Sequence, residues 1–125
     1  MVKNILSIAI TVLLLLSAGL FEHFYLKKEF NEFNEVLVEL YKKTEDRTAL
    51  KEDGEAAQAI WEKKKKTLHI VIPHTSIVYV DYWLSEATGL IGEGKYELAL
   101  PKLGVLRTII EALPATYEPS LENIL

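Results

Sequence analysis

The chain opens with an uninterrupted apolar run. The 17 residues from Ile5 to Phe21 carry no charge, and only two serines and one threonine among them are polar. As an α-helix this run is about 26 Å long, slightly less than the ~30 Å hydrocarbon core of a bilayer. Phe24 and Tyr25 follow, where interfacial aromatic rings are commonly found. The pattern predicts a transmembrane helix.

Three interpretations of this run compete. A cleavable signal peptide would use Ser17-Ala18-Gly19 as its cleavage site, and a buried core helix would have the same composition. A retained anchor is favoured because the run is long and continues without a break into a helical pattern. Lys3 favours a cytoplasmic N-terminus, although Lys27 and Lys28 nearly balance it. We therefore predict a single-pass cell-membrane protein with an anchor over 1–26 and an extracytoplasmic domain over 27–125.

The next segment has a helical period. Apolar residues at steps of three, four and three predict a helix over 24–44 with one buried face. These residues are Phe30, Phe33, Leu37 and Leu40. A connection should follow within 44–54. Asp53 is a plausible N-cap for a second helix that begins near Glu55.

Residues 67–80 are ambiguous. Their many β-branched side chains favour a strand, but no second strand is evident that could pair with it. A helical reading places six apolar residues on one broad stripe, and it is preferred. They are Ile70, Ile77, Val80, Leu84, Ala87 and Ile91. Pro73 then either kinks this helix or marks the first turn of a new one.

The last helix has the clearest pattern, and it follows a turn marked by Gly89, Gly92 and Gly94. Its seam, with steps of three and four, comprises Tyr96, Ala99, Leu103, Leu106, Ile110 and Leu113. Pro101 should bend its first turns and Pro114 should end it, while residues 121–125 should dock on the bundle. The predicted fold is all-α, an N-terminal transmembrane helix followed by a small antiparallel three- or four-helix bundle.

Composition excludes several classes of function. The chain has no cysteine, so disulfides, thiolate zinc sites and a cysteine nucleophile are ruled out. Its net charge is −4, which argues against nucleic acid as a partner. The hydrophobic share of 50% is too high for a disordered chain.

No catalytic or cofactor-binding constellation is apparent. His69 and His74 are five residues apart, which separates them by about 140° on a helix instead of the i,i+4 spacing of a zinc site. We therefore expect structural histidines near the bundle seam. No serine lies in a nucleophile-elbow context, and the glycines do not form a dinucleotide fingerprint. A non-catalytic protein without metal or cofactor is predicted.

Two groups of residues are candidates for binding. Aromatic side chains form either a contact for a partner or part of the core, and Tyr79 and Trp83 are spaced to stack. These aromatic candidates are Trp61, Tyr79, Tyr82 and Trp83. The run Lys63, Lys64, Lys65 and Lys66 is either an anionic-surface contact or a solvated face, and the solvated face is favoured because the four point around the whole helix.

Two resemblances carry further expectations. Gly94 to Leu100 resembles the opening of a tetratricopeptide helix, which implies a helical hairpin. Across most of the chain, an apolar anchor precedes four further elements: Trp61-Glu62-Lys63-Lys64, Ile72-Pro73-His74, a helix with Tyr96 and Ala99, and Leu121-Glu122-Asn123-Ile124-Leu125. This order resembles the bacterial domain-of-unknown-function 4363 family. The resemblance implies a small, helical, membrane-anchored protein, often encoded beside a multi-span membrane protein, and it does not imply any particular activity.

The leading hypothesis is a membrane-tethered interaction or accessory protein that acts with an integral membrane partner. The membrane itself would be bound through Ile5–Phe21. The alternative is an extracytoplasmic sensor or binding module for a small ligand or an anionic envelope polymer. The seam from Tyr96 to Leu113 also leaves a homo-oligomer open.

Overall fold

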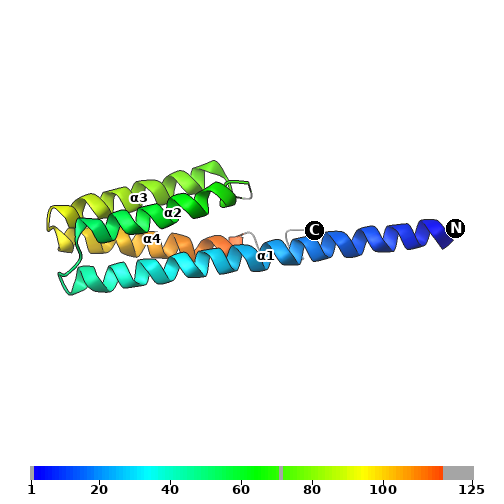
Figure 1. Cartoon of the computed structure of the whole chain (residues 1–125), viewed down its shortest axis with the longest axis horizontal. Helices are drawn as coiled ribbons and strands as arrows, with labels where there is room; N and C mark the ends of the chain where they lie inside the picture. The colour runs from blue at the N-terminus through cyan, green and yellow to red at the C-terminus, as the bar shows by residue number, and fades with distance from the viewer. Residues whose placement is uncertain (1, 71, 117–125) are drawn as a thin grey trace.

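The computed structural model describes residues 2–70 and 72–116 and contains four α-helices. They are α1 (Val2–Glu45), α2 (Lys51–Leu68), α3 (His74–Gly92) and α4 (Tyr96–Thr116). Each helix packs against its neighbour in the chain and α1 also packs against α4, so the four close into an antiparallel bundle (Figure 1). The described residues contain no strand. The all-α prediction is confirmed.

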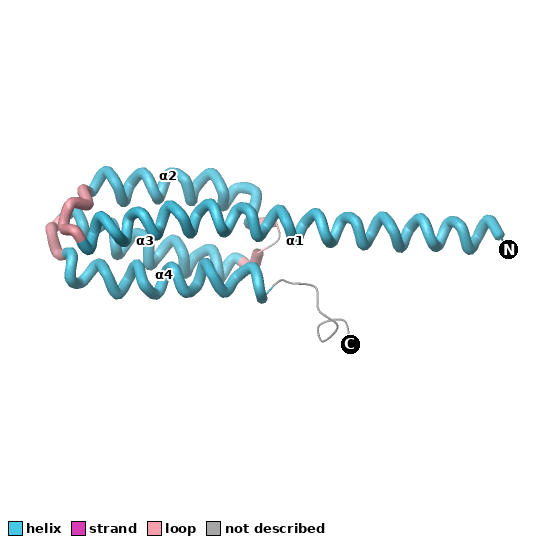
Figure 2. Tube along the Cα trace, turned by 90° about the horizontal axis from the view of Figure 1, so that it is seen from below, coloured by secondary structure: helices cyan, strands magenta, loops and turns pink. Residues whose placement is uncertain are grey.

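The first helix has two parts with different surroundings. Its N-terminal part contains an 18-residue window of mean hydropathy 2.3, and no residue of this window is buried. From Leu26 onward one face of the same helix is buried in the bundle. Figure 2 shows the N-terminal part projecting beyond the bundle as a continuation of α1. The interpretation as a buried core helix is therefore wrong, and this segment is long and apolar enough to cross a membrane.

The core lies between the four helices and follows the predicted stripes. The stripes of α1 and α4 are buried as expected, with Tyr96 half-buried at the start of α4. The largest fully buried side chains are Trp61, Phe30, Phe33, Leu37, Leu68, Leu84, Leu103, Leu106, Ile110, Val80 and Thr44. Close packing of these side chains accounts for most of the stability of the bundle.

Two connections at the same end of the bundle each contain a residue with a positive φ just after the preceding helix ends. After α1, Arg47 has φ 59° and the Thr48 N–H donates to the Lys43 carbonyl at 2.8 Å. After α3, Gly94 has φ 74° and the Lys95 N–H donates to the Leu90 carbonyl at 2.8 Å. These bonds satisfy carbonyls that a helix end otherwise leaves unpaired. The α3–α4 connection confirms the predicted helical hairpin.

The start of α2 differs from the prediction. The helix begins at Lys51 and not near Glu55, and Asp53 is not its N-cap. Leu50 is the N-cap residue, and its backbone N–H donates to the Asp53 carboxylate at 2.8 Å. An acidic residue at the third helical position can satisfy this N–H by reaching back, which is half of a capping box. The connection after α1 is consequently shorter than expected.

The region 67–80 holds a break instead of one continuous stripe. Helix α2 ends at Leu68, and α3 begins at His74 with Pro73 as its N-cap residue. Ile70 was expected on the buried stripe, but it lies between the helices and is 77% exposed. The proline favours a new helix here because it has no N–H to donate to a preceding turn.

Two further helix-end predictions were wrong. Gly89 lies inside α3, and Pro114 lies inside α4, which continues to Thr116. A proline removes only its own N–H and keeps a helical φ, so a last turn can continue past it. The expected docking of residues 121–125 concerns residues outside the described part of the chain.

One glycine in α2 is required by close packing. A Cβ at Gly54 would lie 2.7 Å from Thr88 Oγ1 and 2.8 Å from Thr88 Cγ2. Thr88 cannot turn away without losing the bond from its hydroxyl to the Leu84 carbonyl at 2.8 Å. At Gly89 in α3, by contrast, an added Cβ would meet no other heavy atom within 4 Å.

We predict opposite effects for alanine at these two glycines. Gly54→Ala should lower the free energy of unfolding by about 1–2 kcal/mol, because overpacking outweighs the gain in helix propensity. Gly89→Ala should raise it by about 0.5–1 kcal/mol, because only the propensity changes. Urea unfolding of the full chain in detergent micelles, followed by circular dichroism, measures both values. Equal stabilities of the two variants would contradict the α2–α3 contact.

Candidate functional site

The outer face of α3 carries an exposed aromatic and apolar surface. Ile77, Val80 and Leu84 occupy the buried face of this helix, so residues half a turn away point to solvent. Val78, Tyr79 and Tyr82 are 46%, 61% and 54% exposed. We call these three residues the α3 surface. It is adjacent to a shallow depression lined in part by Tyr82, Ser85 and Glu86.

Trp83 links the α3 surface to α4. Its ring meets the Tyr82 ring edge-on at 5.4 Å between centroids, and the Lys102 ammonium lies 5.0 Å from its centre. The expected stacking of Tyr79 on Trp83 is replaced by this Tyr82–Trp83 pair. Trp83 is half-buried against the core, so its contact with Tyr82 joins the α3 surface to the packed interior.

Trp61 belongs to the core. It is 1% exposed, and its ring packs on Phe33 at 5.1 Å between centroids. Its Nε1–H donates to the Asp81 carboxylate at 2.7 Å, so the buried polar group is satisfied. Of the four aromatic candidates, this one is therefore not available to a partner.

Two of the four lysines in the run hold helices together. The Lys64 ammonium donates to the Glu29 and Glu32 carboxylates of α1, both at 2.8 Å. Burial favours the neutral form of Lys64, but the bonds to the two glutamates outweigh it and raise its pKa. The hydrogen bond from Lys64 lowers the pKa of Glu32. Lys64 thus joins α2 to α1.

Lys65 has a similar role between α2 and α3. It donates to Glu62 at 2.7 Å and lies 3.4 Å from the Asp81 carboxylate. The hydrogen bond to Glu62 is the main reason that its pKa is raised. Lys63 and Lys66 are exposed, and neither forms an ion pair with any residue that the structure describes. Within the described part of the chain, the run is therefore divided into two lysines that link helices and two that pair with no carboxylate.

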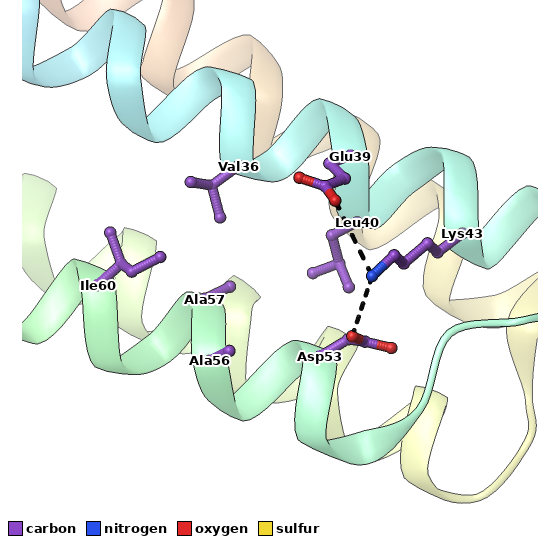
Figure 3. A pocket seen from close by; sticks show the side chains of 8 residues that line it. All are labelled: Val36, Glu39, Leu40, Lys43, Asp53, Ala56, Ala57 and Ile60. Carbon is purple, nitrogen blue, oxygen red and sulfur yellow. Dashed lines mark hydrogen bonds and ion pairs between the residues drawn. The ribbon is translucent and has the colours of Figure 1, made fainter.

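A groove lies between α1 and α2 (Figure 3). Its volume is about 180 Å³, and its walls include Val36, Leu40 and Ile60. At one end the Lys43 ammonium lies between two carboxylates, 3.2 Å from Asp53 and 3.9 Å from Glu39. The bond from the Leu50 N–H is the main cause that lowers the pKa of Asp53. One cation and two carboxylates leave a net charge of −1 at this end, but each acidic residue that lines the groove contacts Lys43.

The histidines do not lie in the bundle seam as expected. His69 and His74 are exposed and flank the connection between α2 and α3. His69 Nδ1 lies 3.3 Å from the Lys65 carbonyl. Among the described residues, no group of three or more histidine or carboxylate side chains is placed to hold a metal ion.

Two exposed residues of interest were missed by the pattern analysis. Val78 enlarges the α3 surface, and its position four residues before Tyr82 on one helix face would have indicated this. Ile70 was assigned to the core stripe. Its proximity to Pro73 was the available indication that the stripe is interrupted.

The fold and these surfaces define a class: an antiparallel four-helix bundle carried on an exposed apolar helix. The family described as Domain of unknown function (DUF4363) matches residues 21–124. The chain belongs to this family, as the resemblance in its sequence implied. The match begins at Phe21, so the helical bundle lies within it and most of the apolar run lies outside. No curated protein and no solved structure matches the chain.

We predict that Asp81 stabilises the bundle through Trp61. Asp81→Ala should lower the free energy of unfolding by about 1–3 kcal/mol, because it leaves the buried indole N–H without an acceptor. Asp81→Asn keeps an acceptor oxygen and should cost less. Urea unfolding monitored by tryptophan fluorescence measures both. Glu86→Ala, which removes another carboxylate of α3, is the control, and an Asp81→Ala variant as stable as this control would contradict the assignment.

Proposed function

We propose that this protein is a non-catalytic, membrane-tethered accessory protein that presents the α3 surface to an integral membrane partner. The observation that carries the proposal is the continuity of α1. One helix contains the exposed apolar segment at its N-terminal end and contributes Phe30, Phe33 and Leu37 to the bundle core. The bundle is therefore fixed to the segment that would span the bilayer, with no linker between them.

Tethering of this kind favours weak, specific contacts. A bundle confined close to one membrane meets a membrane partner at a high effective concentration. A small contact can then suffice, and the α3 surface with its two exposed tyrosines has the composition of an interface centre. Lys3 at the N-terminal end favours an arrangement in which the bundle lies outside the cytoplasm.

The distance of the α3 surface from the bilayer also supports an integral membrane partner. Trp61 contacts Phe33 of α1 and Asp81 of α3, so these residues lie at one level of the bundle. At 1.5 Å per residue, Val78 and Tyr82 are then about 13–20 Å beyond Phe21. A headgroup layer is only about 5–8 Å thick, so the surface would lie just outside it. A partner would reach it with a short membrane-proximal domain or loop.

Paired charges support a role without catalysis. Lys43, Lys64 and Lys65 each contact carboxylates, and the groove between α1 and α2 has apolar walls. The alternative of a binding module for a small ligand is less favoured, since this groove is open and its charged side chains already contact one another.

The first prediction tests whether the apolar segment is retained. The full-length chain with a C-terminal tag should remain in membranes after alkaline carbonate extraction and keep the intact mass of its 14.2 kDa sequence plus the tag. Leu13→Lys with Leu15→Lys should release it, because each charge costs about 2.5–3.5 kcal/mol at the helix centre. Recovery of a soluble chain trimmed near Gly19 would refute tethering.

The second prediction tests the α3 surface. A photoactivatable phenylalanine analogue at Tyr82 should form one discrete adduct with an integral membrane protein when illuminated in native membranes. Tyr79→Ala should reduce the yield of this adduct severalfold, because it removes the neighbouring contact. Leu98, which is 57% exposed on α4, is the control position and should give no such adduct. Equal labelling from both positions would contradict a specific surface.

A further inference from the structure

The end of the bundle from which the apolar segment emerges has an unusual composition. We call it the basal end, and it contains the connection between α2 and α3 (Figure 2). Ile70 in this connection is 77% exposed, more than any other described large apolar side chain outside the N-terminal apolar segment. Ile70 therefore adds little to the core, and its side chain is available for a contact outside the bundle.

The bundle places Ile70 at the level of a headgroup layer. Lys64 bonds to Glu29 and Glu32 of α1, which fixes the register of the two antiparallel helices. Ile70 follows Lys64 by six residues and lies two residues past the end of α2, so it is level with about Tyr25, only ~6 Å beyond Phe21 along the helix axis. The headgroup layer extends about 5–8 Å from the hydrocarbon. A shallow depression lined by Tyr25, Lys63 and Thr67 confirms that these parts of α1 and α2 are adjacent.

Four exposed lysines lie on the parts of α1 and α2 that end near this level of the bundle. Lys27 and Lys28 lie on α1, and Lys63 and Lys66 lie on the last turns of α2. None of the four forms an ion pair within 4.0 Å with another residue in the described ranges, and the one electrostatic contact is that of Lys28, which contributes to the lowered pKa of Glu32. The nearby Glu62 is already bound by Lys65 at 2.7 Å, which leaves the cations dominant at this end of α2.

We propose that the basal end is a second membrane contact, in which Ile70 inserts at the headgroup boundary while Lys63 and Lys66, with Lys27 and Lys28, bind the phosphates of anionic lipids. The contact rests on the proposed function, because the apolar segment must first span the bilayer. A lipid surface fits better than an anionic polymer, since an apolar tip between lysines matches the boundary of headgroups and acyl chains. A polymer would leave Ile70 in water.

The second contact would fix the rotation of the bundle. A single helix allows the bundle to turn about the axis of α1. Contact through the α2–α3 connection, which lies to one side of α1, would stop this rotation. The α3 surface would then face one direction in the membrane plane, which deepens the proposed role toward a partner.

The chain has no cysteine, so single probes can be placed without background. The full-length protein is reconstituted in nanodiscs of phosphatidylcholine, with or without phosphatidylglycerol, and an environment-sensitive fluorophore is attached at Ile70→Cys. Shallow spin-labelled lipids then report contact at positions 70 and 50 by quenching, and lipids labelled deep in the acyl chain report it at position 15. The matched control is Leu50→Cys, which is 61% exposed at the opposite end of the bundle. Leu15→Cys reports whether the apolar segment is inserted.

Quenching is expected at position 70 but not at position 50, and it should be stronger with phosphatidylglycerol. Lys63→Gln with Lys66→Gln should lower the equilibrium between inserted and withdrawn tip by roughly 10- to 30-fold, as expected for two lysines at an anionic surface. Lys42→Gln with Lys51→Gln, two exposed lysines near the other end, should change nothing.

Three results would overturn the inference. Quenching at position 15 without quenching at position 70 refutes the second contact and leaves the tether intact. Equal quenching at position 70 in both lipid mixtures refutes recognition of anionic headgroups. A probe response to soluble polyphosphate, but not to phosphatidylglycerol, assigns the lysines to a polymer. Absence of quenching at position 15 refutes the tether as well, so the two failures are distinguishable.

Discussion

The structure depends on one constraint, the sharing of α1 between two environments. Its N-terminal part is apolar on every side, which suits lipid, and its C-terminal part is apolar on one stripe only, which suits a bundle. Phe33 of that stripe packs against Trp61, the largest buried side chain of the core. Because no turn separates the two parts, α2, α3 and α4 all have positions defined relative to the exposed segment.

Polar contacts set the register of the helices that apolar packing brings together. Lys64 fixes α2 against α1 through two glutamates, and Asp81 fixes α3 against α2 through Trp61. Apolar stripes alone permit a helix to slide by a turn, since the next leucine fits nearly as well. A buried indole that needs one acceptor, and a half-buried ammonium that needs two carboxylates, do not permit this slip. The same contacts explain why Lys64 and Trp61, which are candidate binding residues in the sequence, instead hold the bundle together.

Much of the fold could be predicted from the sequence because strict periodicity in α1 and α4 reports burial directly. The prediction failed where tertiary context decides. Ile70 fits a helical stripe numerically, but Pro73 interrupts the helix and turns it outward. Asp53 is a good N-cap residue type, yet from the third helical position it accepts the N–H of Leu50. For the candidate surface, the sequence identified Tyr79 and Tyr82 as candidate contact residues. It could not show that Trp61 is buried, because that burial depends on α1, which is distant in sequence.

The unbroken junction within α1 makes chain length there as important as side-chain identity. One residue inserted between Phe21 and Leu26 would rotate everything after it by about 100° and lift it by about 1.5 Å. The contacts inside the bundle would survive such a change, but every outward-facing residue would point in a new direction relative to the exposed apolar segment. An insertion at this junction can therefore change the direction in which the outward-facing residues point while the stability of the bundle stays the same.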